Sequence, residues 1–138
     1  MTTGTRTRTV EVLADDLVVF LETGSAPEGL FAADVFCDLT LPQWRLQAIG
    51  RDELVAMRRH SHPAPGTVPR RRLDATATGF VLEVEERWQD ADGDWYCREL
   101  LRADVRDGAV AQLSVYCTGD WDAARRERHA REVRLPRP

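Results

Sequence analysis

Apolar and polar residues alternate along one long stretch of the chain, from Gly79 to Trp121. Alternation with a period of two is typical of strands that bury one face. Two Asp-Gly pairs, Asp92-Gly93 and Asp107-Gly108, interrupt the stretch, and this dipeptide favours the tight turn of a β-hairpin. The pattern therefore predicts three long antiparallel strands, and we expect the rest of the chain to pack onto them.

Centring each turn on its Asp-Gly pair predicts a register for these strands. Glu86 then lies opposite Glu99, and Glu99 lies opposite Tyr116. The opposite face is rich in Glu and Arg and is expected to meet solvent or a second subunit. A slip of one residue in the first turn would instead pair Glu85 with Glu99. In the preferred register one face, apolar at one end and polar at the other, gathers Phe80, Leu82, Val84, Glu86, Trp88, Cys97, Glu99, Leu101, Ala103, Val105, Val110, Gln112, Ser114, Tyr116 and Thr118.

Helical spacing of apolar residues marks the N-terminal part of the chain. From Val10 to Thr23 these residues recur every three or four positions, and Gly24 supplies the stop signal. The stretch Ser25-Ala26-Pro27-Glu28 has the pattern of a capping box with proline in the first turn, which predicts a short second helix as far as Ala33. Residues 1–9 are expected to form a flexible tail.

The remaining elements are predicted from shorter patterns. A third helix is expected from Arg51 to Arg59, followed by a proline-rich loop from His60 to Pro69. Asp120 can cap a final helix that runs through Arg131. Short strands are predicted at Val35–Thr40, Trp44–Ile49 and Val68–Thr76. The order of elements specifies a single α+β domain over residues 1–138, in which N-terminal helices cover one face of a curved antiparallel sheet and leave a pocket between them.

Composition narrows the class of protein. The net charge of -4 argues against general nucleic-acid binding, although Arg70, Arg71 and Arg72 form a short basic run. No apolar run approaches the roughly 20 residues that span a bilayer, and the N-terminus lacks the apolar core of a signal peptide. The chain has three cysteines, spaced unlike any zinc motif, and an odd number fits reduced thiols. We therefore predict a cytoplasmic protein that binds neither nucleic acid nor membrane.

Glu86 and Glu99 are the most specific candidates for catalytic residues. Two carboxylates that face each other in a partly dry pocket cannot both ionise cheaply, so the pair shares a proton and one member titrates high. Such a pair can act as acid and base near neutral pH, and Tyr116 could donate a hydrogen bond to a developing oxyanion. The alternative is that either glutamate pairs with Arg98 or Arg102 at the surface of the sheet.

Five further residues are predicted to bind substrate: Trp44, Trp88, His60, Cys97 and Ser114. Tryptophans line pockets for apolar ligands, although each is as readily a core residue. The loop that carries His60 is expected to rim the pocket, where this histidine could shuttle a proton. His60 and His62 form an H-x-H pair without a third ligand nearby, so no metal site is predicted. Cys97 has no positioned histidine to activate it as a nucleophile.

The phrases LFAADVFCDLTLP, ATGFVLEVEERW and DGAVAQLSVYCTGDWD, with a helix led by Gly50 between the first two, carry a family resemblance. From about Val10 to Trp121 the chain resembles the nuclear transport factor 2-like superfamily, in its SnoaL-like (polyketide cyclase-like) branch. The resemblance implies a cone-shaped α+β barrel, commonly dimeric, with a pocket between the helices and the concave sheet. The members of this superfamily include ketosteroid isomerases, polyketide cyclases, limonene epoxide hydrolase and proteins without catalytic activity.

The resemblance also implies chemistry without a metal or organic cofactor on apolar small molecules. In the isomerases a base lies near the position of Asp38, and a second acid lies on a central strand, where Glu99 is the nearest candidate. A shift of one residue in the comparison would turn Asp38 to the other face. We therefore predict a cofactor-independent isomerase, cyclase or dehydratase with Glu99, Asp38, Glu86 and Tyr116 as catalytic residues. The alternatives are a non-catalytic binding or dimerisation module and an epoxide hydrolase, which would need an arginine such as Arg98 inside the cone.

Overall fold

The computed structural model describes residues 9–138. The predicted flexible tail lies outside the described residues except for Thr9, whose side chain accepts a hydrogen bond from the backbone of Val12 and caps the first helix. None of the helices in the described part of the chain is both long and apolar enough to cross a membrane. The elements in chain order are α1 (Val10–Thr23), β1 (Phe31–Leu41), β2 (Trp44–Ile49), α2 (Arg51–Ser61), β3 (Gly66–Ala75), β4 (Gly79–Asp90), β5 (Gly93–Arg106), β6 (Ala109–Cys117), β7 (Trp121–Asp122) and α3 (Ala123–Glu132).

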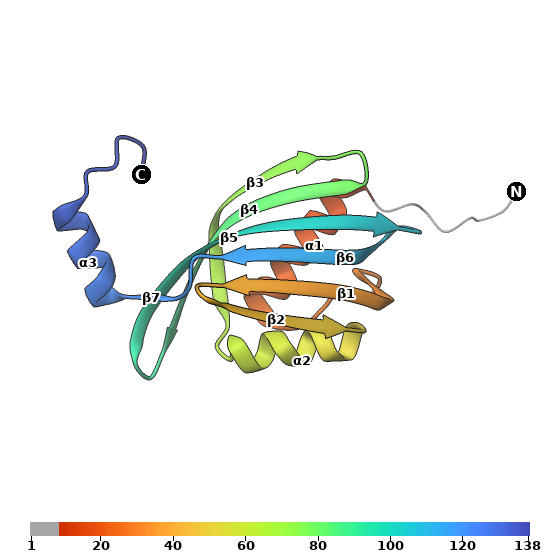
Figure 1. Cartoon of the computed structure of the whole chain (residues 1–138), viewed down its shortest axis with the longest axis horizontal. Coiled ribbons are helices and arrows are strands. Elements are labelled where there is room, and N and C mark those ends of the chain that lie inside the picture. Colours follow the sequence, from red (N-terminus) through yellow and green to blue (C-terminus); the bar gives the residue numbers. More distant parts are fainter. Residues whose placement is uncertain (1–8) are drawn as a thin grey trace, which may run out of the picture.

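The strands form one curved sheet in the order β2-β1-β6-β5-β4-β3, and the short β7 pairs with β5. All neighbouring strands are antiparallel except β1 and β6, which pair in parallel, so the seven-stranded sheet is mixed. Figure 1 shows α1 lying across one face of the sheet and α2 lying along the edge formed by β2. The predicted α+β cone fold is confirmed, with a sheet that does not close into a barrel.

The first helix is the element that covers the concave face. Its buried positions are Leu13, Ala14, Leu17, Val18, Phe20 and Leu21. They repeat every three or four residues, so one stripe of the helix packs onto the sheet. Gly24 ends the helix in the left-handed conformation with φ 75°, and its N–H donates to the carbonyl of Phe20. The predicted bounds and stop signal of this helix are confirmed.

The first hairpin has a different turn from the predicted one. Asp90 pairs with Gly93, so the turn residues are Ala91 and Asp92, and Gly93 follows the turn with φ 121°. The predicted pairing of Glu86 with Glu99 is therefore wrong by two residues. A shift of two keeps every side chain on its face, so the predicted inward face of β4 and β5 is confirmed.

The second hairpin, between β5 and β6, has the predicted turn residues, but most of its paired residues differ from those predicted. Asp107 and Gly108 both have positive φ, 53° and 76°, as a tight hairpin turn requires. An irregularity between Asp104 and Val105 then shifts the pairing by one residue. As a result Glu99 pairs with Cys117, and Tyr116 lies on the outer face.

Two other sequence predictions are wrong. Residues 25–30 form a bend and turn rather than a helix, and the segment after them is the long strand β1. The final helix is capped by Asp122, whose carboxylate accepts from the N–H of Arg125, and not by Asp120. Every residue of α3 keeps substantial exposure, and this helix lies beyond β7, away from the cone (Figure 1).

Candidate active site

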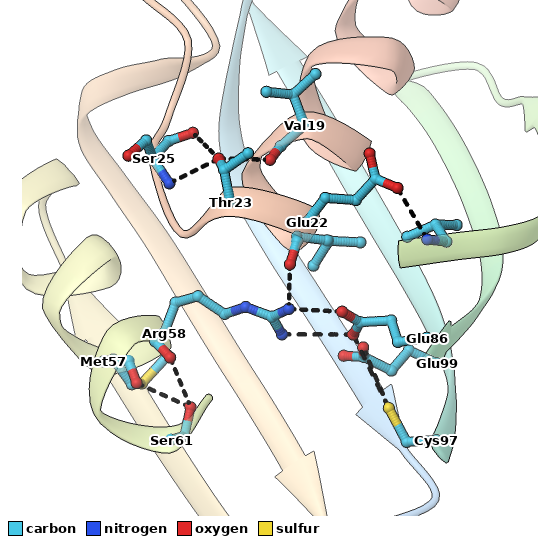
Figure 2. A network of polar contacts seen from close by, with 12 residues as sticks. Val19, Glu22, Thr23, Ser25, Met57, Arg58, Ser61, Glu86, Cys97 and Glu99 are labelled. Atoms are coloured by element: carbon cyan, nitrogen blue, oxygen red, sulfur yellow. Dashed lines mark hydrogen bonds and ion pairs between the residues drawn. The ribbon is translucent and has the colours of Figure 1, made fainter. Parts of the chain in front are cut away.

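Glu86 is held inside the cone by an arginine from α2. The Glu86 side chain is 2% exposed, and both of its oxygens accept from Arg58, at 2.5 Å (Nη2 to Oε1) and 3.4 Å (Nη1 to Oε2). The same Nη2 donates to the carbonyl of Leu21 at the end of α1, at 2.6 Å (Figure 2). Arg58 therefore ties α1, α2 and β4 together. Burial raises the pKa of Glu86, while the charge and hydrogen bonds of Arg58 oppose that rise.

Glu99 lies next to this ion pair and has no cationic partner of its own among residues 9–138. Its side chain is 6% exposed. Cys97 Sγ lies 3.7 Å from Glu99 Oε1 and 3.9 Å from Glu86 Oε2, so the thiol stands between the two carboxyl groups (Figure 2). A single thiol proton can serve only one acceptor at a time. A buried carboxylate without a cationic partner is expensive to keep ionised, so Glu99 is suited to hold or exchange a proton.

Cys117 from β6 completes the polar cluster. Its sulfur accepts from the N–H of Gly119 at 3.4 Å. The sulfurs of Cys97 and Cys117 and a carboxylate oxygen of Glu99 all lie within 4.8 Å of one another. Thiolate sulfur and carboxylate oxygen are atoms that bind Zn²⁺ in proteins. Cys97, Glu99 and Cys117 are therefore the residues that could hold a metal ion. The predicted absence of a metal stays a prediction.

Two buried polar atoms near the cluster have no partner among the described residues. These atoms are Arg58 Nε and His62 Nε2. Burial, followed by the charge of Arg58, lowers the pKa of His62 to about 4, so its imidazole is neutral at physiological pH. Its ring lies against Trp88 on β4, with 4.0 Å between ring centroids. An unpaired buried donor or acceptor is costly, and each of these atoms could bind a polar group of a ligand.

The structure separates the predicted site residues into two groups. Glu86, Glu99, Cys97 and Trp88 gather inside the cone. Three others point to the outer face of the sheet: Asp38, Ser114 and Tyr116. Their predicted inward placement is wrong. An extra residue in β6, between Val110 and Gln112, shifts its pairing with β5 by one and turns Ser114 and Tyr116 outward. Asp38 pairs with Ser114 on that same outer side.

On the outer face of the sheet, Asp38 forms an ion pair with Arg45. Its carboxylate accepts two hydrogen bonds from Arg45, at 2.5 and 2.9 Å. The hydrogen bond and charge of Arg45 hold the pKa of Asp38 below its usual range. A carboxylate that is paired and exposed in this way is a poor base. Arg98 also lies outside the cone and pairs with Glu83 at 3.6 Å, so it does not supply the arginine that the epoxide hydrolase hypothesis needs; the arginine inside the cone is Arg58.

The predicted substrate-binding residues Trp44 and His60 also lie outside the cone. Trp44 is 67% exposed on the β1–β2 hairpin. His60 is exposed because α2 continues to Ser61, and the buried histidine is His62, which follows the helix. Sequence reasoning missed Arg58 and His62. Arg58 lies four residues after Leu54, the buried residue of α2. Residues four apart share one face of a helix, so this spacing could have indicated that Arg58 faces the core.

Iodoacetamide should alkylate Cys117 ahead of Cys37 and Cys97 in the folded protein. A hydrogen bond from Cys97, assisted by the N–H of Gly119, lowers the pKa of Cys117. Burial raises the pKa of Cys37 to about 12, and the hydrogen bond to Cys117 together with burial raises the pKa of Cys97. The thiolate is the reactive form. Timed labelling and peptide mass spectrometry measure the order, with urea-unfolded protein as the control; Cys97 reacting first would contradict this arrangement.

Comparison with known proteins supports the fold. No family model matches the sequence, and no curated protein is detectably similar to it. Solved structures do match. A nuclear transport factor 2-like protein from Anabaena variabilis superposes with a TM-score of 0.69 at 15% identity, over 87% of this chain and 96% of that one. The chain therefore has the nuclear transport factor 2-like fold, which confirms the fold expected from the SnoaL-like resemblance.

Two further matches carry names that describe an activity. A proposed polyketide cyclase from Pseudomonas putida superposes with a TM-score of 0.62 at 15% identity, over 78% of this chain and 90% of that one. A proposed ketosteroid isomerase from Kribbella flavida superposes with a TM-score of 0.58 at 21% identity, over 92% of this chain and 90% of that one. At these identities the likeness establishes the fold, and one fold carries many functions.

Proposed function

We propose that the protein is an acid-base enzyme that moves a proton on an apolar, carbonyl-containing small molecule, in an isomerisation, cyclisation or dehydration. The observation that carries the proposal is Glu99: a buried carboxyl group without a cationic partner among the described residues, next to a second glutamate that is fixed by Arg58. Proteins keep such groups where their proton is used, since burial otherwise destabilises them. The names of two structural neighbours, a cyclase and an isomerase, agree with this reaction class.

The cluster provides the groups that such a reaction needs. When ionised, the Glu99 carboxylate would take a proton from a carbon next to the carbonyl group and return it to a different atom of the same substrate. Arg58 Nε–H, which is buried and without a partner, could donate to the oxygen on which negative charge develops. Glu86 would orient the Arg58 guanidinium group through its two hydrogen bonds and balance its positive charge. This proton transfer requires neither a metal nor an organic cofactor, and the predicted absence of both stays a prediction.

Exchange of substrate protons in deuterium oxide tests the proposed function without knowledge of the natural substrate. Enolisable cyclic ketones of increasing size are incubated with the protein, and loss of the protons next to the carbonyl group is followed by proton magnetic resonance. We expect at least one bicyclic or larger ketone to exchange faster with the protein than in buffer. If the whole series exchanges at the buffer rate, the proposed activity is wrong.

One observation favours the non-catalytic alternative. Neither of two clefts found on the described part of the chain is lined by Glu86 or Glu99. The enzyme proposal therefore requires that a substrate reach Glu99 by a route other than these two clefts. If the polar cluster serves only to orient α2 against the sheet, the protein is a binding or dimerisation module, and the ketone exchange experiment separates this case from the enzyme.

We also propose a homodimer formed through the outer face of the sheet. Leu100 and Tyr116 are neighbours across β5 and β6 and are 41% and 56% exposed. Light scattering should give twice the 15.6 kDa mass of one chain, and Leu100→Asp should give a monomer because the charge would be buried in the interface. Val12→Asp, at an exposed position of α1, is the matched control and should remain a dimer. A monomeric wild-type protein would contradict the proposal.

The cytoplasmic location remains a proposal. All three cysteines are free thiols, as expected for a protein kept in a reducing compartment. The predicted lack of binding to nucleic acid and membrane likewise awaits a test.

A further inference from the structure

A cleft of about 620 Å³ lies beyond the polar end of the inner face, between the start of β3, the β4–β5 hairpin and α3. We call it the hairpin cleft. Figure 1 shows the β4–β5 hairpin projecting past the rest of the sheet in this region. Trp88 and Trp95 line the cleft, and their ring planes lie within 11° of each other with centroids 6.5 Å apart. Clefts of this size hold small organic molecules, and parallel indoles favour flat aromatic ones.

Two arginines without acidic partners line the same cleft. Arg87 comes from β4 and Arg126 from α3. Within residues 9–138 neither guanidinium has a carboxylate oxygen within 4.0 Å. Both lie over the ring of Tyr96, with the guanidinium carbon 6.0 Å from the ring centroid for Arg87 and 4.9 Å for Arg126. Both positive charges are therefore close to Tyr96, whose ring does not neutralise them.

The acidic residues of the protein are concentrated before α3. Residues 9–122 contain 11 arginines and 21 acidic residues, while α3 beside the cleft carries four arginines and two glutamates, so the arginines of this helix favour anions at this end of the protein. Two guanidinium groups that line one cleft add positive charge there, and guanidinium groups are well shaped to bind a carboxylate. Asp94 lines the cleft as well. With two arginines and one aspartate, the lining carries a net charge of about +1. This charge favours a ligand with a single negative charge over ligands with several.

We propose that the hairpin cleft is a binding site for planar aromatic monocarboxylates. The aromatic rings would lie against Trp95 and the small part of the buried Trp88 side chain that lines the cleft, and the carboxylate would bind Arg126 and Arg87. The site does not require Glu99 to be catalytic. It does lie close to the cluster, because Trp88 follows Glu86 by two residues on the same face of β4, about 7 Å along the strand.

Calorimetric titration of the full chain with 2-naphthoate tests the proposal, with the neutral 2-naphthamide as the comparison. The carboxylate should bind about tenfold or more tightly than the amide, because charge-assisted hydrogen bonds to arginine are lost in the amide. Arg126→Gln should weaken naphthoate binding by about tenfold and leave the amide unchanged. Trp95→Leu should weaken both probes, because both lose the aromatic surface.

Three variants serve as controls. Arg125→Gln removes a neighbouring charge from α3 that does not line the cleft, and Trp44→Leu removes an indole on a distant hairpin. Both should bind naphthoate as the wild type does. Glu99→Gln should also bind normally, which separates this site from the proposed reaction. The proposal is overturned if both probes bind equally, if Arg126→Gln changes nothing, if Glu99→Gln abolishes binding, or if millimolar naphthoate produces no heat of binding.

Discussion

Replacing Arg58 by methionine should destabilise the protein by roughly 3–5 kcal/mol at neutral pH, because removal of one partner leaves the other as an uncompensated buried charge. The side chains of Arg58 and Glu86 are only 12% and 3% exposed, so solvent screens the pair poorly. The same change also removes the hydrogen bond to the carbonyl of Leu21. Urea unfolding of the variant and the wild type measures the difference.

The pH dependence of that variant follows from the pKa of Glu86. Burial raises this pKa, and Arg58 opposes the rise, so in Arg58→Met the pKa of Glu86 rises further above its unfolded value. A carboxyl group with a raised folded pKa destabilises the protein above that pKa and ceases to do so as the pH falls toward the unfolded value. The variant should therefore be more stable at about pH 5 than at about pH 7.5.

Two comparisons isolate the buried pair. The double variant Arg58→Met with Glu86→Leu should regain most of the lost stability, because a buried ion pair can be replaced by apolar residues at little cost. Arg45→Met breaks the solvent-screened pair with Asp38 and should cost much less stability than Arg58→Met does. Equal losses for Arg45→Met and Arg58→Met would show that the ion pair inside the cone has no special role in stability.

Glu99→Gln should reduce the rate of ketone proton exchange by about 10²- to 10⁴-fold, the usual contribution of a positioned general base. The amide keeps the shape of the carboxyl group but cannot accept the proton. It should leave the protein folded, and more stable at neutral pH than the wild type, because no buried carboxylate without a cation remains. Exchange rates measured at equal protein concentration, together with melting curves, test both statements.

Tyr116→Phe is the matched control for Glu99→Gln. Tyr116 was expected from the sequence to assist catalysis, but it lies on the outer face of the sheet. Its substitution should leave the exchange rate unchanged. If Tyr116→Phe slows exchange as much as Glu99→Gln does, the reaction takes place elsewhere and the proposed site is wrong.

The sequence predicts the inward face of the sheet better than it predicts the pairing of residues. Strand alternation is a local property, so the buried side of β4 and β5 could be read from the positions of apolar residues. The first turn lies one residue earlier than predicted, and this shifts the pairing by two and returns Glu86 and Glu99 to the same face. The irregularity between Asp104 and Val105 shifts β6 by one, and nothing in the local sequence marks it.

The other failures arise from contacts between distant segments. The capping-box pattern at Ser25 is a local helix signal, but the following residues from Phe31 onward pair in parallel with β6, and this long-range pairing outweighs local propensity. Arg58 is one of 19 arginines. Its partner Glu86 lies 28 residues further along the chain, so only the folded structure shows which arginine enters the cone.

In the proposed mechanism Glu86 and Glu99 form a buried carboxyl pair that holds a proton available for chemistry. Infrared titration detects it directly, because a protonated carboxyl group in an apolar site has its own C=O stretching band. In the wild type this band should persist above the pH at which a solvated glutamate ionises, and it should disappear in Glu99→Gln or Glu86→Gln. If the wild type has no such band, or if both variants keep it, the pair does not hold the proton and the proposed mechanism is wrong.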